Sequence, residues 1–233
     1  MIIKGFAKLT LLDYPGKVAC TVFTGGCNFR CPFCHNASLA VRPGEVDSIP
    51  EEEVFDLLRK RRGILDGVCV TGGEPLMHGE ALEDFIGRVK ELGYSVKLDT
   101  NGSYPERLKA LIEKGLVDKV AMDIKNSPEK YGETAGIESF DMSPILASID
   151  ILKNSGVDYE FRTTVVDELH SSDDLEKIGR MIEGAKAYYL QAFVDSGDLI
   201  GNGMSAPSNE KMAEFLKISR KYIENSHIRG KSD

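Results

Sequence analysis

The stretch GVCVTGGEPLMHGEALEDFIGRVKELGYSVKLD, residues 67–99, contains one complete strand–helix–strand unit. Its two ends, Gly67–Thr71 and Ser95–Asp99, are short, rich in apolar and β-branched residues, and stop at polar or glycine residues, as strands do. Between them, Gly79–Leu92 has a helical pattern that stops at Gly93, a residue type that commonly ends helices. This order predicts two parallel strands joined by a right-handed crossover helix.

The same unit recurs along the chain. Further strand patterns occupy Val18–Phe23, Lys119–Asp123, Tyr159–Val165 and Ala187–Gln191, and further helical patterns occupy Pro50–Arg62, Pro105–Lys114, Met142–Ser155, Ser171–Glu183 and Ser208–Asn225. Six units are two fewer than the eight of a closed barrel. We therefore expect an α/β fold, an incomplete (β/α)6 barrel (a partial TIM barrel) with a parallel sheet, as one domain over residues 1–226. The polar tail from His227 to Asp233 is expected to be frayed.

Composition excludes several classes of protein. Of the 233 residues, 42% are hydrophobic and 28% are charged, which is typical of a globular protein rather than a disordered or fibrous one. No run of 18 apolar residues could form a membrane-spanning helix, and Met1 to Lys17 has no apolar signal-peptide core, so we expect a cytoplasmic protein. The net charge of −8 argues against nucleic acid or anionic membranes as partners. The basic cluster Arg59–Arg62 is expected to be a solvated helix end.

Three of the five cysteines lie within eight residues, in Cys27-Asn-Phe-Arg-Cys31-Pro-Phe-Cys34. An odd number of cysteines without a secretory signal indicates a reduced compartment and a metal site rather than disulfides. Soft thiolate ligands select zinc or an iron–sulfur cluster. A structural zinc site needs four ligands, and His35 follows Cys34 too closely to chelate the same ion well.

Two other cysteines, Cys20 and Cys69, lie inside strand patterns and are expected to be buried core residues. Ordinary electron-transfer clusters use four cysteines. The three that remain therefore suggest a four-iron cluster with one iron left open to a ligand.

The spacing Cys27-x3-Cys31-x2-Cys34, with Phe33 before the last cysteine, resembles the signature of the radical S-adenosylmethionine (SAM) superfamily. Gly72-Gly73-Glu74-Pro75 after the second strand belongs to the same pattern, and the resemblance covers essentially the whole chain. It implies that the cysteines hold a [4Fe-4S] cluster whose unique iron binds the amino and carboxylate groups of SAM. The reduced cluster would pass one electron to the sulfonium, giving methionine and a 5′-deoxyadenosyl radical that takes hydrogen from a substrate.

The resemblance also implies a set of cofactor-binding residues: Phe33, Gly72, Gly73, Glu74, Asp99, Asp123, Lys125, Arg162 and Gln191. The Gly-Gly-Glu run would bind the SAM ammonium, although by itself it is also a common turn. Arg162, a charge inside a strand that must be paired, would contact the SAM carboxylate or ribose, with a structural ion pair as the alternative. Lys125 is a weaker candidate of the same kind. Gln191 stands where relatives can have histidine, which leaves its role open.

Two carboxylates, Asp99 and Asp123, end neighbouring strands of the predicted barrel and should face the same rim. Two acids this close repel each other, and one would take up a proton unless a cation lay between them. The pair resembles the glycyl-radical-activating branch of the superfamily, in which a monovalent cation, sodium or potassium, sits beside the SAM carboxylate. Its ligands here would be Asp99, Thr100, Asp123 and the carbonyl of Ala121, unless these residues are turn caps or solvated side chains.

Several features favour the activating branch. Cys34-His35-Asn36 is typical of it, and the absence of a further cysteine-rich insert predicts a single cluster. Leu12-Asp13-Tyr14-Pro15-Gly16 and Arg162-Thr163-Thr164-Val165 resemble activators of anaerobic ribonucleoside-triphosphate reductase, which sequence separates poorly from pyruvate formate-lyase activators. The implied partners are a glycyl radical enzyme as protein substrate and a flavodoxin or ferredoxin as electron donor.

Two other functions stay open at this point. One is a small radical SAM enzyme that acts on a nucleotide-like metabolite, as 7-carboxy-7-deazaguanine synthase does. The other is a non-catalytic zinc-binding module. The remaining histidines, His78, His170 and His227, have no evident partners and are expected at the surface.

Overall fold

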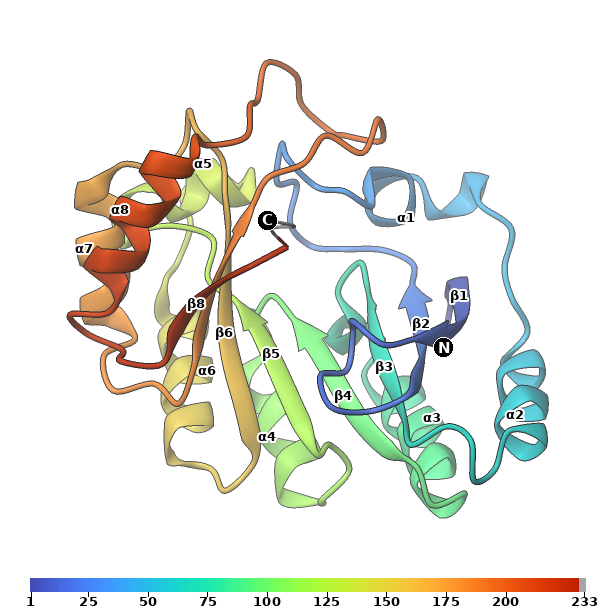
Figure 1. The fold of residues 1–233 in the computed structure, drawn as a ribbon. Helices are drawn as coiled ribbons and strands as arrows, with labels where there is room; N and C mark the ends of the chain where they lie inside the picture. Colours follow the sequence, from blue (N-terminus) through green and yellow to red (C-terminus); the bar gives the residue numbers. More distant parts are fainter. Residues whose placement is uncertain (231–233) are drawn as a thin grey trace.

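The computed structural model describes residues 1–230, which form one curved sheet with helices on its outer side (Figure 1). The strands are β1 (Ile3–Thr10), β2 (Ala19–Thr24), β3 (Gly67–Gly72), β4 (Ser95–Thr100), β5 (Lys119–Asp123), β6 (Asp158–Val165), β7 (Tyr188–Ala192) and β8 (Ser226–Arg229). They lie side by side in chain order. β1 is antiparallel to β2, and every later neighbour is parallel.

The helices are α1 (Ala37–Val41), α2 (Glu51–Lys60), α3 (Glu80–Glu91), α4 (Pro105–Glu113), α5 (Tyr131–Ala135), α6 (Ser143–Asn154), α7 (Ser172–Met181) and α8 (Asn209–Ser219), with 3₁₀ turns η1 (Pro43–Glu45), η2 (Pro75–His78) and η3 (Pro128–Lys130). The longer helices α2, α3, α4, α6, α7 and α8 follow β2 to β7 in turn. The six predicted units are therefore confirmed. Only the last helix differs clearly from the expected range, since it ends at Ser219 rather than Asn225.

The two faces of the sheet have opposite character. On β4, Val96 and Leu98 are fully buried in the apolar core beneath the helices. Successive side chains on a strand point to opposite faces, so Lys97 and Asp99 project to the inside of the curve. Whereas a closed barrel fills its interior mainly with branched apolar side chains, this sheet places charged groups there, and these groups build the site.

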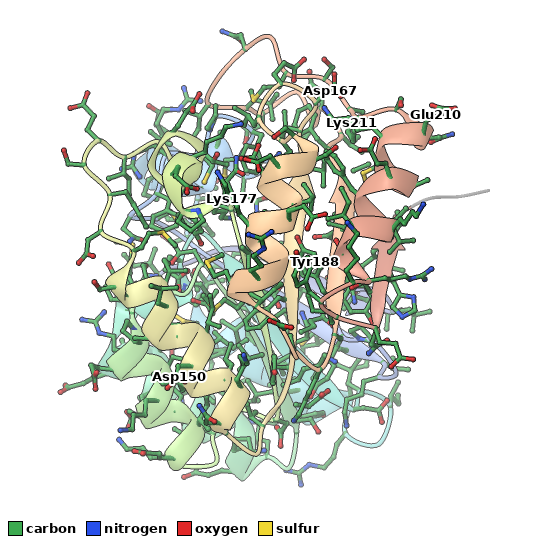
Figure 2. All side chains as sticks on the ribbon, turned by 90° about the vertical axis from the view of Figure 1, so that its left-hand side faces the viewer. Asp150, Asp167, Lys177, Tyr188, Glu210 and Lys211 are labelled. Atoms are coloured by element: carbon green, nitrogen blue, oxygen red, sulfur yellow. The ribbon has the colours of Figure 1, made fainter. Side chains whose placement is uncertain are left out.

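Figure 2 shows the outer side formed by the last helices. Lys177 on α7 pairs with Asp173 one turn earlier, and Lys211 on α8 pairs with Asp167. Beneath these helices Tyr188 of β7 is fully buried, and its hydroxyl donates a hydrogen bond of 2.7 Å to Thr163. The polar outer surface and apolar inner surface of the helices explain the amphipathic patterns in the sequence.

Two strands were not predicted, and the sheet ends at both of them. β1 pairs with β2, while β8 pairs with β7 through the neighbours Tyr188↔Ser226 and Tyr189↔His227. The predicted fraying is therefore wrong for residues 227–229, because β8 satisfies backbone groups that β7 would otherwise leave unpaired. Residues 231–233 of the predicted tail lie outside the described residues. No pairing joins β1 to β8 within residues 1–230, so the barrel is not closed.

His170 also departs from its expected surface position. It is buried, and its ring lies 3.0 Å from the carbonyl oxygen of Lys125 and 3.1 Å from the backbone nitrogen of Val166. The ring thereby joins the segments that follow β5 and β6. His78 is half-buried, with its ring 3.1 Å from the carbonyl oxygen of Gly25, and only His227 is exposed as predicted.

Within residues 1–230, no helix has both the length and the apolar character needed to cross a membrane.

Candidate functional site

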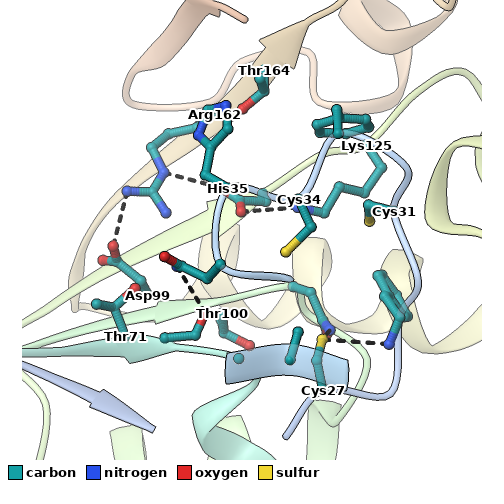
Figure 3. A pocket seen from close by; sticks show the side chains of 18 of the residues that line it. Cys27, Cys31, Cys34, His35, Thr71, Asp99, Thr100, Lys125, Arg162 and Thr164 are labelled. Carbon is teal, nitrogen blue, oxygen red and sulfur yellow. Dashed lines mark hydrogen bonds and ion pairs between the residues drawn. The ribbon is translucent and has the colours of Figure 1, made fainter. Parts of the chain in front are cut away.

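The carboxyl ends of the parallel strands open into one cavity (Figure 3). Its lining is Cys27, Phe29, Cys31, Phe33, Cys34, His35, Asn36, Ala40, Thr71, Gly72, Gly73, Asp99, Thr100, Asn101, Asp123, Lys125, Arg162, Thr164 and Gln191. Apart from Glu74 and Ala121, every residue that the sequence singled out for the site lines this cavity. Parallel strands bring such residues together because all their carboxyl ends lie at one edge of the sheet.

The three cysteines lie on the loop that follows β2. The loop turns tightly at its end, where the amide of Cys34 donates to the carbonyl of Cys31 at 3.0 Å. Burial raises the pKa of Cys27 to about 11 and that of Cys31 to about 12, so the metal-free thiols are neutral. Within residues 1–230, no three His, Cys, Asp or Glu side chains converge closely enough to hold one metal ion.

Gly72 at the end of β3 and Gly73 directly after it lie against the start of the cysteine loop. The amide of Gly73 donates to the carbonyl of Thr24 at 2.9 Å, and the amide of Glu74 donates to the carbonyl of Gly26 at 2.8 Å. A Cβ on Gly73 would lie 1.9 Å from the oxygen of Gly26, a distance that no side chain could occupy. Gly72 has a φ of +114°, which disfavours any other residue. The glycines are therefore needed for contact between two loops of the protein.

Glu74 does not line the cavity, although its partners Thr100 and Asn101 do. Its carboxylate is fully buried and accepts hydrogen bonds from the amide of Leu76 at 3.0 Å, the hydroxyl of Thr100 at 2.8 Å and the amide of Asn101 at 2.6 Å. These hydrogen bonds give the side chain a positioning role, because they hold the loop after β4 in place. Its contact with the cofactor stays a prediction. Burial raises the pKa of Glu74 to about 7, although these hydrogen bonds act in the opposite direction.

Arg162 of β6 pairs with both predicted carboxylates, and Figure 3 shows its contact with Asp99. Its guanidinium is 3.0 Å from Asp99 and 3.0 Å from Asp123. Lys125 adds a second cation 3.0 Å from Asp123, and the buried Lys97 forms a further ion pair with Asp99. The structural ion pair considered as an alternative for Arg162 is therefore present, and Arg162 still lines the cavity.

These cations offset the repulsion between the carboxylates of Asp99 and Asp123. Burial would raise the pKa of Asp123, but Arg162 and Lys125 outweigh it and lower the pKa to about 2. Arg162 and Lys97 likewise hold the pKa of Asp99 below its ordinary value despite burial. A bound cation is not needed to relieve this repulsion, contrary to the prediction, because protein side chains already balance both carboxylates. A monovalent cation at Asp99, Thr100, Asp123 and Ala121 stays a prediction.

Lys97 was missed from the sequence, although a signal was present. β4 reads Ser-Val-Lys-Leu-Asp-Thr, in which apolar and polar residues alternate. A strand of a parallel sheet that is covered on both faces is more uniformly apolar. The alternation marks Lys97 and Asp99 as members of one polar face.

The segment after β7 packs on the cysteine loop, which no local pattern had indicated. Phe193 stacks on His35 with ring centres 5.6 Å apart. Asp198 accepts hydrogen bonds from the amide of Ser38 at 3.0 Å and its hydroxyl at 2.7 Å. The amide of Gly201 donates to the carbonyl of Pro32 at 2.8 Å. The segments that follow β7 and β2 are thereby joined.

The donor set fits the groups that the resemblance implied. One half of the cavity carries three thiols spread around a single loop, which suits a polynuclear cluster with three protein ligands. The other half carries the cations Arg162 and Lys125, together with carboxylate, hydroxyl and amide groups. These groups are suited to bind a carboxylate, an ammonium and the hydroxyls of a ribose.

The contact between the glycine run and the cysteine loop leads to a prediction. Gly73→Ala should lower the free energy of unfolding by about 3 kcal/mol, because the new methyl group overlaps the carbonyl of Gly26. Gly87→Ala is the matched control, since nothing lies within 4 Å of its added Cβ and it sits inside α3. That control should be neutral or stabilising. Urea denaturation of both variants checks this, and equal midpoints for the two would contradict it.

The buried Glu74 predicts a pH dependence of stability. Between pH 4.5 and about 7 the folded protein binds more protons at Glu74 than the unfolded chain, so stability due to this group falls as pH rises. The free energy of unfolding of wild type minus that of Glu74→Gln should therefore decrease across this range and level off above it. Denaturation at several pH values measures the difference, with the exposed Glu113→Gln as a control for lost charge. Parallel curves for wild type and Glu74→Gln would show that Glu74 does not titrate there.

This chain is similar to several known proteins. The family model described as the Radical SAM superfamily matches residues 21–182. A Methanocaldococcus jannaschii protein named as a glycyl-radical enzyme activating enzyme is 33% identical over 98% of this chain and 95% of its own length. A 7-carboxy-7-deazaguanine synthase of the same organism is 23% identical over 91% of this chain and 88% of its own length.

Among solved structures, a domain of a pyruvate-formate lyase-activating enzyme from Bacteroides vulgatus superposes with a TM-score of 0.58. It is 19% identical, and the match covers 70% of this chain and 99% of that domain. The structural likeness shows the shared partial barrel, and the family model covers the cysteine loop, the glycine run and the ionic cluster around Arg162. The chain is therefore a member of the radical SAM superfamily of enzymes.

Proposed function

We propose that this enzyme activates a glycyl radical enzyme, by cleaving SAM reductively and taking a hydrogen atom from one glycine of that partner protein. The observation that carries the proposal is that one cavity contains both the cysteine loop and the polar cluster around Arg162, at the carboxyl ends of the parallel strands. The full-length similarity to a relative named as such an activator supports the same choice. Anaerobic ribonucleoside-triphosphate reductase is the first partner to test, and pyruvate formate-lyase the second.

The residues in the two halves of the cavity would have different roles. Cys27, Cys31 and Cys34 would hold a [4Fe-4S] cluster, which when bound supplies the single electron for SAM cleavage. Arg162 and Lys125 would hold the carboxylate of SAM, since both are cations that face the cavity. The pKa of each is raised by the neighbouring carboxylates, which outweigh the effect of burial, so both remain charged at neutral pH.

The glycine run would position the other end of the amino-acid portion of SAM. Gly72 and Gly73 line the cavity without side chains, so their backbone can approach an ammonium group closely. Thr71, Thr164 and Gln191 add hydroxyl and amide groups from β3, β6 and β7. Phe33 adds an apolar surface on the side of the cysteine loop.

The missing closure of the barrel suits a polypeptide substrate. β1 and β8 are the two edges of the sheet and do not pair within residues 1–230. A closed barrel would fill its interior with side chains, whereas this sheet is not closed between β1 and β8 and has a polar inner face. An extended loop carrying a glycine could enter by this route. The external electron would come from a flavodoxin or ferredoxin.

Cysteine replacement tests the assignment of the cluster. Cys31→Ala should abolish reductive SAM cleavage and lower the bound iron, because the cluster would keep only two protein ligands. Cys20→Ala is the matched control, since Cys20 is fully buried in the apolar core and its loss should cost only about 1 kcal/mol of stability. Iron and sulfide analysis after anaerobic reconstitution, with 5′-deoxyadenosine as the product assayed, distinguishes the two. Equal loss in both variants, or zinc without labile sulfide, would overturn the assignment.

Isotope transfer tests the partner. With a glycyl radical enzyme carrying Cα-deuterated glycine, deuterium should appear in 5′-deoxyadenosine, and a glycyl radical should appear in the electron paramagnetic resonance spectrum. The Cys31→Ala variant serves as the blank. Deuterium transfer from the reductase but not from pyruvate formate-lyase would name the target. Failure with every glycyl radical enzyme, together with turnover of a purine-like metabolite, would favour the deazaguanine-synthase alternative.

A further inference from the structure

Asn101 directly follows β4 and lines the cavity together with Cys27 and Thr100. Its side-chain nitrogen is 3.8 Å from the sulfur of Cys27. The residue is 6% exposed. None of the roles proposed for the other cavity residues involves Asn101.

The orientation of the Asn101 amide is fixed by its partners. Its oxygen lies 2.9 Å from the backbone nitrogen of Ser103, which can only donate, and also accepts the hydroxyl of Ser103. The amide nitrogen must therefore face the other way, toward Cys27. One of its two hydrogens goes to the side-chain oxygen of Asn28 at 3.0 Å. The second is directed to the sulfur.

The backbone at Asn101 is held just as firmly. Its amide donates 2.6 Å to the buried carboxylate of Glu74, and Asn28 returns a hydrogen bond of 2.9 Å to Ser103. Asn101 therefore uses every donor and acceptor of its side chain within a closed network. Such a network keeps a hydrogen bond to sulfur in place without reorganisation when the charge on the sulfur changes.

Cys27 differs in this respect from the other two cysteines. Its sulfur accepts from the backbone amide of Phe29 at 3.4 Å as well as from Asn101. Among residues 1–230, neither Cys31 nor Cys34 receives a hydrogen bond from a side chain. The cavity thus contains one cysteine whose sulfur has a dedicated side-chain donor.

We infer that Asn101 is a positioning residue that sets the reduction potential of the cluster through its N–H···S hydrogen bond to Cys27. Reduction adds one negative charge to the cluster and its sulfur ligands, and a donor aimed at sulfur stabilises that charge and raises the potential. This inference rests on the cysteine loop holding the cluster. It is independent of which partner protein supplies the glycine.

The test is a redox titration of reconstituted protein, followed by electron paramagnetic resonance of the reduced cluster. Asn101→Ser removes the donor, and Asn101→Asp replaces it with an acceptor of nearly the same shape. At a fixed potential, the ratio of reduced to oxidised cluster should fall about tenfold in Asn101→Ser, which is about 59 mV for one electron. The shift should be larger in Asn101→Asp.

Asn126→Ser is the matched control. Asn126 is also buried, and its amide nitrogen bonds to Thr134 at 2.8 Å and to the carbonyl of Leu169 at 3.0 Å, without contact to a cysteine. The Asn126→Ser variant should have the same cluster reduction potential as the wild type. A wild-type potential in both Asn101 variants, with full iron content, would overturn the inference, as would an equal shift in Asn126→Ser. If Asn101→Ser loses iron, Asn101→Asp alone decides, since it keeps the shape of the site.

Iron and sulfide content separates this result from a failure of the proposed function. The protein could bind the cluster and show the predicted shift in potential, yet transfer no deuterium from glycine. In that case the role of Asn101 would stand and the proposal that the enzyme is an activator would be wrong.

Discussion

The guanidinium of Arg162 between Asp99 and Asp123 is the interaction on which the arrangement of the site depends. It joins β6 to β4 and β5 at the edge where the cavity opens, through two contacts of 3.0 Å. Loss of one partner would leave buried charge unpaired, which is strongly destabilising. With Lys97 and Lys125, this cluster contains three cationic side chains and two carboxylates, so its net charge is +1. That surplus favours a carboxylate ligand in this half of the cavity.

A second set of contacts joins the polar half of the cavity to the cysteine loop. Gly73 and Glu74 bind that loop through backbone amides, while the side chain of Glu74 binds the loop after β4. Asn101 then reaches back from this loop to Cys27. Three loops far apart in sequence thus share one hydrogen-bond network, so the position of a cluster and the position of a SAM molecule would be coupled through buried protein groups.

Much of the fold could be predicted because it rests on local periodicity. Six strands and six helices followed from apolar patterns and from glycines such as Gly93 that end helices. β1 and β8 were missed because edge strands bury less surface and have weaker patterns, as the largely half-buried β1 shows. The buried position of His170 was missed for a related reason, since one of its backbone partners, Lys125, lies in a different loop, the one after β5.

The sequence by itself determined the parallel topology, the cysteine loop, the glycine run and the acids at the strand ends, since each depends on residue type and spacing. Only the tertiary structure decided what these residues contact. It showed that Arg162 balances both acids, that Glu74 faces the protein interior, and that the amide of Asn101 faces Cys27. Register between strands and the packing of loops set these contacts, and neither is encoded in a short stretch of sequence.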